Sequence, residues 1–80
     1  MNELFTGYGR QAHQIKDTIR TLQSENAPAT ERELFNSLRQ NIDTPFSEIK
    51  DTYEDLRKRG EIYSYPSGGY VLVKVTDDVL

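Results

Sequence analysis

The side chains able to do chemistry in this chain are mainly basic and aromatic. Its 80 residues include ten Lys or Arg, five Tyr, one His and no Cys. A metal site needs several His or Cys ligands, so we expect the single histidine, His13, to lie on the surface. No nucleophile–base pair stands in a recognisable motif, and the sequence has no phosphate-binding loop of the G-x-x-x-x-G-K-[ST] type. The sequence therefore predicts neither an enzyme nor a bound cofactor or metal ion.

The charges are unevenly distributed along the chain. The formal net charge is −3, but residues 10–24 sum to +2 and residues 57–74 to +3, whereas residues 25–55 sum to −5. Phosphate binding depends on Lys and Arg, so the two positive segments favour a nucleic-acid ligand. The acidic middle segment disfavours DNA contact through that part of the chain.

Two apolar stripes at helical spacing predict the first two elements that hold these charges. The first covers residues 10–24 and ends ahead of Pro28, which steers the preceding residue away from helix. The second begins at a capping box of Thr30 and Glu33 and runs to about Gln40.

A third helix is predicted from a Thr44 cap followed by Pro45 at its first position, and it stops at Gly60. Its apolar face carries Phe46, Ile49, Tyr53 and Leu56. Its other face carries mostly acidic side chains, which would meet phosphates if the helix entered a DNA groove: Ser47, Glu48, Lys50, Asp51, Glu54 and Asp55. We expect this face to be solvated, with a Glu54–Lys58 pair offsetting repulsion between the acids.

Beyond Gly60 the pattern becomes extended and predicts a β-hairpin. Residues 61–65 and 70–75 are the strands, residues 66–69 form the loop, and Tyr65 is placed opposite Tyr70. Residues 1–9 are expected to form an N-terminal arm and residues 76–80 a short acidic tail.

The fold class predicted from this order is α+β: a winged helix-turn-helix, in which three helices pack on a C-terminal β-hairpin wing. A chain this short buries only about 60% of its unfolded surface, so residues 1–80 are expected to form a single domain. Its apolar runs are far shorter than the ~20 residues that span a bilayer, which favours a cytoplasmic protein without membrane contact.

The segment from the third helix into the wing resembles a known family. The run Leu56–Tyr63 reads LRKRGEIY and is followed by Pro66, Gly69 and Tyr70. This stretch, about a third of the chain, is similar to the small C-terminal winged-helix domain of archaeal minichromosome maintenance (MCM) helicases and to archaeal winged-helix regulators. In the helicases the domain tunes the motor and carries no ATPase. The resemblance implies an isolated appendage or a stand-alone regulator in DNA replication or transcription.

Double-stranded DNA is therefore the expected partner, contacted mainly by the first helix and the wing. Among the wing aromatics, Tyr65 is expected to reach the ligand, whereas Tyr63 and Tyr70 are expected to pack across the strands. The basic run 57–59 has a second interpretation, as cations that stabilise the end of a helix. The candidate DNA-binding residues are Arg10, Lys16, Arg20, Ser47, Lys50, Arg57, Lys58, Arg59, Tyr65, Ser67 and Lys74.

Two alternatives to a DNA-binding monomer follow from the same sequence. The acidic face of the third helix would suit a basic surface on a protein partner, for example a helicase to which the chain is an appendage. The apolar residues Leu4, Phe5 and Tyr8 of the arm would suit a homodimer contact.

Overall fold

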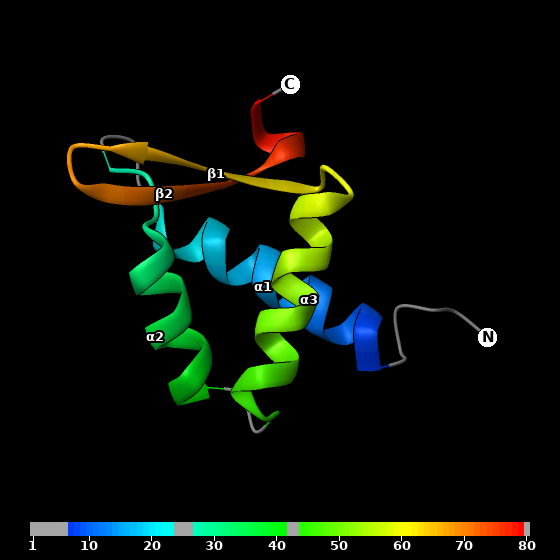
Figure 1. The fold of residues 1–80 in the computed structure, drawn as a ribbon. Coiled ribbons are helices and arrows are strands. Elements are labelled where there is room, and N and C mark those ends of the chain that lie inside the picture. Colours follow the sequence, from blue (N-terminus) through cyan, green and yellow to red (C-terminus); the bar gives the residue numbers. More distant parts are fainter. Residues whose placement is uncertain (1–6, 24–26, 42–43, 80) are drawn as a thin grey trace.

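The computed structural model describes residues 7–23, 27–41 and 44–79. Three helices, α1 (Gly7–Leu22), α2 (Glu31–Asn41) and α3 (Phe46–Lys58), are followed by an antiparallel hairpin of β1 (Ile62–Ser67) and β2 (Tyr70–Val75). A short 3-10 helix, η2 (Thr76–Val79), follows the hairpin. In Figure 1, α2 and α3 lie in front of α1, and the hairpin lies across one end of the helices. The predicted α+β order is confirmed and is compatible with a winged-helix layout.

One apolar core joins the three helices to the inner face of the hairpin. Complete burial of an aliphatic or aromatic side chain contributes roughly 1.5–3 kcal/mol, so a chain of this length depends on the whole cluster. The predicted stripes supply most of it, although Phe46 is only partly buried and Thr52 takes a buried place on α3. The buried apolar residues are Ile15, Ile19, Ala29, Leu34, Leu38, Ile49, Tyr53, Leu56, Ile62, Val73 and Val75.

The start of α1 differs from the prediction. The helix begins at Gly7, three residues before the predicted Arg10, so the end of the expected arm is helical. Glycine costs about 1 kcal/mol in a helix, but Gly9 is buried and tertiary packing outweighs that propensity. Residues 1–6 of the arm, and with them most of the proposed dimer contact, lie outside the described residues, as does the side chain of Tyr8.

The predicted capping box at the start of α2 is confirmed. The Thr30 amide donates to Glu33 Oε1 at 3.1 Å, and the Glu33 amide donates to Thr30 Oγ1 at 3.0 Å. The Thr44 cap on α3 was wrong, because Pro45 occupies the N-cap position and no side chain caps the helix. The Pro45 carbonyl accepts from the amides of Glu48 and Ile49 at 3.0 and 3.3 Å, which places the helix start one residue later than predicted.

The end of α3 is a Schellman motif built on glycine. Gly60 has a φ of 77°, a left-handed conformation that favours residues without a Cβ. Its amide donates to the Arg57 carbonyl at 3.1 Å, and the Glu61 amide donates to the Leu56 carbonyl at 3.0 Å. This turn sends the chain directly into β1, as the sequence predicted.

The register of the hairpin differs from the prediction by two residues. Ser67, not Tyr65, lies opposite Tyr70, and Tyr65 lies opposite Leu72. The cause is the turn: Gly68 and Gly69 both have positive φ, which is typical of a two-residue type I′ loop rather than the predicted four-residue loop. A shift of two residues keeps each side chain on its original face, so the buried side of the hairpin is as expected.

Two contacts that the sequence did not predict tie the hairpin to the rest of the chain. The segment before α2 runs beside β2, where Thr30 bridges Leu72 and the Val73 amide donates to the Ala29 carbonyl at 2.9 Å. The expected acidic tail instead forms η2, anchored where the Thr76 hydroxyl donates to the Gly60 carbonyl at 2.6 Å.

No helix in the described residues is long and apolar enough to cross a membrane.

Candidate functional site

Five of the predicted DNA-binding cations surround the junction between α3 and β1, which we call the junction cluster. The last turn of α3 supplies the basic run, the Lys16 side chain reaches the junction from α1, and Lys74 lies opposite Tyr63 in the hairpin. Residues far apart in the sequence therefore meet at one end of the molecule. The junction cluster comprises Lys16, Arg57, Lys58, Arg59 and Lys74.

Acidic residues one helical turn earlier pair with two of these cations. Arg57 Nη1 lies 2.7 Å from Glu54 Oε1, and Arg59 Nε lies 2.9 Å from Asp55 Oδ2. The predicted Glu54–Lys58 pair is thus replaced by Glu54–Arg57, at i,i+3 spacing. Both pairs are exposed enough to contribute well under 1 kcal/mol each, so they weaken the local positive field more than they stabilise the fold.

A third cation of the junction cluster bridges two elements. Lys16 Nζ lies 2.5 Å from Glu61 Oε1, and both side chains are partly buried, with 23% and 38% of their surface exposed. The bond holds the middle of α1 against the start of the hairpin. Lys58 and Lys74 have no ion-pair partner within the described residues, so they are the junction cations most available to a phosphate.

The remaining candidates are spread over other surfaces. Ser47 and Lys50 are exposed near the start of α3, about 17 and 12 Å along the helix axis from Lys58 at its end. Arg10 and Arg20 are exposed on α1, ten residues and about 15 Å apart. Ser67 is exposed beside the hairpin turn.

Of the two wing tyrosines that were expected to pack, Tyr63 is partly buried and Tyr70 is exposed. Tyr63 and Tyr65 stack on one face of the hairpin, with ring centroids 5.7 Å apart, and both are partly buried. Tyr70, which was expected to pack, is 62% exposed. The register shift explains the difference, because it places the small Ser67 opposite Tyr70 in place of Tyr65.

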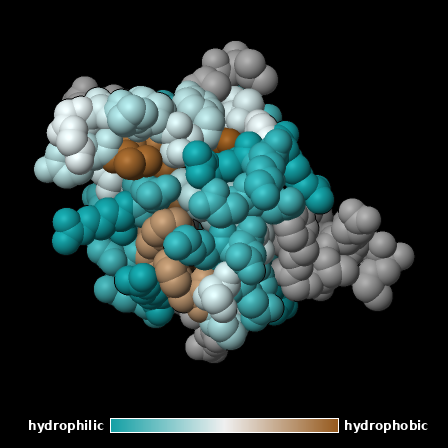
Figure 2. Space-filling view, in the orientation of Figure 1, coloured by the Kyte–Doolittle hydropathy of each residue, from teal (hydrophilic) through white to brown (hydrophobic). Residues whose placement is uncertain are grey.

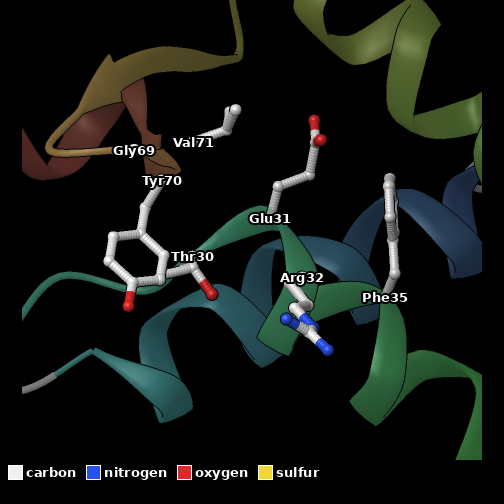
Figure 3. A pocket seen from close by; sticks show the side chains of 7 residues that line it. All are labelled: Thr30, Glu31, Arg32, Phe35, Gly69, Tyr70 and Val71. Carbon is white, nitrogen blue, oxygen red and sulfur yellow. The ribbon is translucent and has the colours of Figure 1, made fainter.

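A groove between the wing and the first turn of α2 was missed by sequence reasoning. It has a volume of about 250 Å³, and Figure 3 shows side chains from both elements lining it. Tyr70 and Val71, which lie in it, are the exposed large hydrophobic residues of the described chain. Figure 2 shows hydrophobic residues surfacing beneath the hairpin and along α2. The groove, which we call the α2–wing groove, is lined by Thr30, Glu31, Arg32, Phe35, Gly69, Tyr70 and Val71.

A buried tyrosine positions the acidic wall of this groove. The Tyr53 hydroxyl donates to Glu31 Oε2 at 2.8 Å, and its ring is fully buried, edge-on to Phe35 at a centroid distance of 5.0 Å. Burial, reinforced by the bond to the Glu31 carboxylate, raises the pKa of Tyr53 well above its ordinary value. Among the described residues Glu31 Oε1 makes no hydrogen bond or ion pair, so this oxygen is available to a ligand.

Within the described residues, no group of three or more His, Cys, Asp or Glu side chains is placed to hold a metal ion. No protein-family model, curated protein sequence or solved structure matches this chain. A function is therefore inferred from its geometry.

Proposed function

We propose that this chain is a winged helix-turn-helix module that binds double-stranded DNA in transcription regulation or DNA replication control. The observation that carries this proposal is the arrangement of the hairpin. Its loop extends past α2 in Figure 1, and the Ala29–Thr30 segment is joined to β2 by an isolated antiparallel bridge and one backbone hydrogen bond. In a module of this shape a helix can lie in a groove of duplex DNA while the wing contacts the phosphate backbone.

Lys58 and Lys74 are the proposed main phosphate contacts. Both belong to the junction cluster, and neither side chain is held by a described carboxylate. Arg57 and Arg59 contribute less, because each must leave or share its acidic neighbour on α3 to reach a phosphate. Lys50 adds a contact from the start of α3, where the exposed Glu48 and Asp51 weaken it. Binding is therefore moderate and strongly dependent on salt.

The test is a salt series of duplex binding by fluorescence anisotropy. Replacing Lys58 and Lys74 together with Gln should weaken binding to every duplex sequence and reduce the salt slope by about 2, roughly one unit for each lost phosphate contact. Gln40→Ala, a change at an exposed position on α2 away from these cations, is the matched control. Unchanged affinity and slope in the double variant would show that the junction cluster does not bind DNA.

A second candidate function, binding of a basic protein surface, is favoured by the α3 face itself. Glu48 and Asp51 are both exposed there, with Lys50 between them, and no described residue pairs with either acid. A chain that works only in this way would show no saturable binding to duplex DNA even at low salt.

A further inference from the structure

The α2–wing groove combines features that are usually separate on a protein surface. It is a hollow, and it is lined by the two large apolar side chains that are exposed among the described residues, Tyr70 at 62% and Val71 at 39% exposure. Exposed apolar side chains that gather around a hollow mark interaction sites, and tyrosine is among the residues that contribute most to protein interfaces. None of the predicted DNA-binding residues lines this groove.

The size and chemistry of the groove limit what it can hold. Its volume of about 250 Å³ is below the roughly 300–1,000 Å³ of pockets for small molecules, but it accommodates one bulky side chain. Phe35, Val71 and the Tyr70 ring form apolar walls, and Figure 3 shows these three side chains around the same space. An aliphatic or aromatic side chain that enters from solvent would bury part of its apolar surface there.

The Glu31 wall of the groove favours a basic side chain over a phosphate. The Glu31 carboxylate keeps Oε1 without a described partner, and this oxygen would repel a phosphate but attract a Lys or Arg. Arg32 is exposed at the rim and carries only hydrogen-bond donors, which suit the backbone carbonyls of an extended peptide.

We propose that the α2–wing groove is a docking site for a short extended segment of a partner protein that carries a bulky apolar residue next to a Lys or Arg. The apolar residue fills the space between Tyr70 and Phe35, and its basic neighbour pairs with Glu31. This surface is separate from the junction cluster, so the chain can hold a protein partner whether or not it binds DNA.

The test is a titration of the full 80-residue, ¹⁵N-labelled chain, followed by amide chemical shifts. The probes are acetylated and amidated pentapeptides of sequence Ala-Lys-Leu-Lys-Ala, with Ala-Lys-Ala-Lys-Ala and Ala-Glu-Leu-Glu-Ala as matched controls. We expect saturable shifts at the amides of Glu31, Arg32, Gly69, Tyr70 and Val71 with the first peptide. Loss of the leucine side chain should weaken binding by about tenfold, and reversal of the charges by about threefold or more.

Variants of the chain separate the two kinds of contact. Val71→Thr keeps the shape and β-propensity of the residue but adds a hydroxyl to the apolar wall, and it should weaken the leucine peptide several-fold. Glu31→Gln keeps an acceptor for the Tyr53 hydroxyl but removes the charge, so it should remove the preference for the Lys peptide over the Glu peptide. Asp17→Asn, an exposed charge change on α1, is the control and should leave all three affinities unchanged.

Four outcomes would overturn the proposal. The first is the absence of saturable shifts at the groove, and the second is an equal response to all three peptides. The third is a set of groove shifts produced by a 16-base-pair duplex and not by the leucine peptide, which would assign the groove to nucleic acid. The fourth is groove shifts produced by dilution of the chain alone, which would assign it to a second copy.

Discussion

Removal of the Tyr53 hydroxyl should destabilise the protein by an amount that the structure defines. The Tyr53→Phe variant keeps the buried ring and its edge-on contact with Phe35, and it deletes the hydroxyl that donates the 2.8 Å hydrogen bond to Glu31 Oε2. Hydrogen bonds to charged groups contribute about 1.5–3 kcal/mol. Glu31 is only partly buried and can regain water, so we expect a loss near the lower value, about 1.5 kcal/mol.

The same variant should change how stability depends on alkaline pH. Burial and the bond to Glu31 raise the pKa of Tyr53 in the folded state, whereas the unfolded chain titrates near its ordinary value of about 10. Above that pH the unfolded state releases a proton that the folded state retains. The stability from this residue is therefore complete below about pH 10 and falls by about 1.4 kcal/mol for each further pH unit, until the folded state also titrates.

Urea unfolding followed by circular dichroism between pH 7 and pH 11.5 measures both effects. Tyr53→Phe should be less stable at pH 7, and its stability should fall less steeply than that of the wild type above pH 10. Tyr70→Phe is the matched control, because Tyr70 is 62% exposed and its change should move neither quantity. Equal stability of Tyr53→Phe and wild type at pH 7, together with parallel alkaline limbs, would refute the role assigned to this hydroxyl.

Two further predictions concern the local signals that shape the fold. Thr30→Ala removes the hydroxyl of the capping box at α2 and should lower the free energy of unfolding by about 1 kcal/mol, measured by urea denaturation at neutral pH, with Thr30→Ser close to wild type. Gly69→Ala should cost roughly 1 kcal/mol because φ is 86°, even though no atom would meet the added Cβ within 4 Å. Gly68→Asn, by contrast, should leave stability nearly unchanged, because asparagine tolerates this conformation in type I′ turns. A large loss in Gly68→Asn would contradict the assigned turn.

The parts of the fold that were predictable from the sequence depend on interactions close together along the chain. The capping box joins residues three apart, and the Gly60 stop closes within six residues. The helical stripes were also readable, because burial of one face repeats every three to four residues whatever it packs against. Each of these signals depends on residues that are close together in the sequence, so it can be recognised without the tertiary structure.

The hairpin register, the start of α1 and the contact between residues 29 and 73 were not predicted correctly from the sequence, because each depends on more than the local pattern. Either a four-residue loop or a two-residue glycine turn closes the hairpin with the same faces buried, so hydrophobic pattern alone does not distinguish the two registers. The start of α1 depends on tertiary packing. Burial of Gly9 stabilises a helical turn in a segment whose glycines disfavour helix. The Ala29–Val73 bond joins residues 44 apart and has no signal in either segment.

The sequence indicated the basic residues of the junction cluster but not the acidic residues that pair with two of them. Counting charges by sequence window gave residues 57–74 a sum of +3 because the window began after Glu54 and Asp55. In the folded chain these two acids pair with Arg57 and Arg59 across one helical turn, so the basic end of α3 is largely neutralised. The α2–wing groove was missed because its two walls, residues 30–35 and 69–71, are far apart in the sequence and are brought together by the Thr30–Leu72 bridge.

The two proposed surfaces differ in how far the fold organises them before a ligand arrives. The α2–wing groove is preformed, because the capping box, the Thr30–Leu72 bridge and the Tyr53–Glu31 bond hold its two walls together. A peptide that enters it therefore orders little of this chain and keeps most of its interaction energy as affinity. In the junction cluster Lys58 is a flexible, exposed side chain, and its neighbours Arg57 and Arg59 must exchange carboxylates for phosphates. DNA binding there draws its free energy mainly from counterion release, which suits a salt-sensitive contact beside a more specific protein-docking groove.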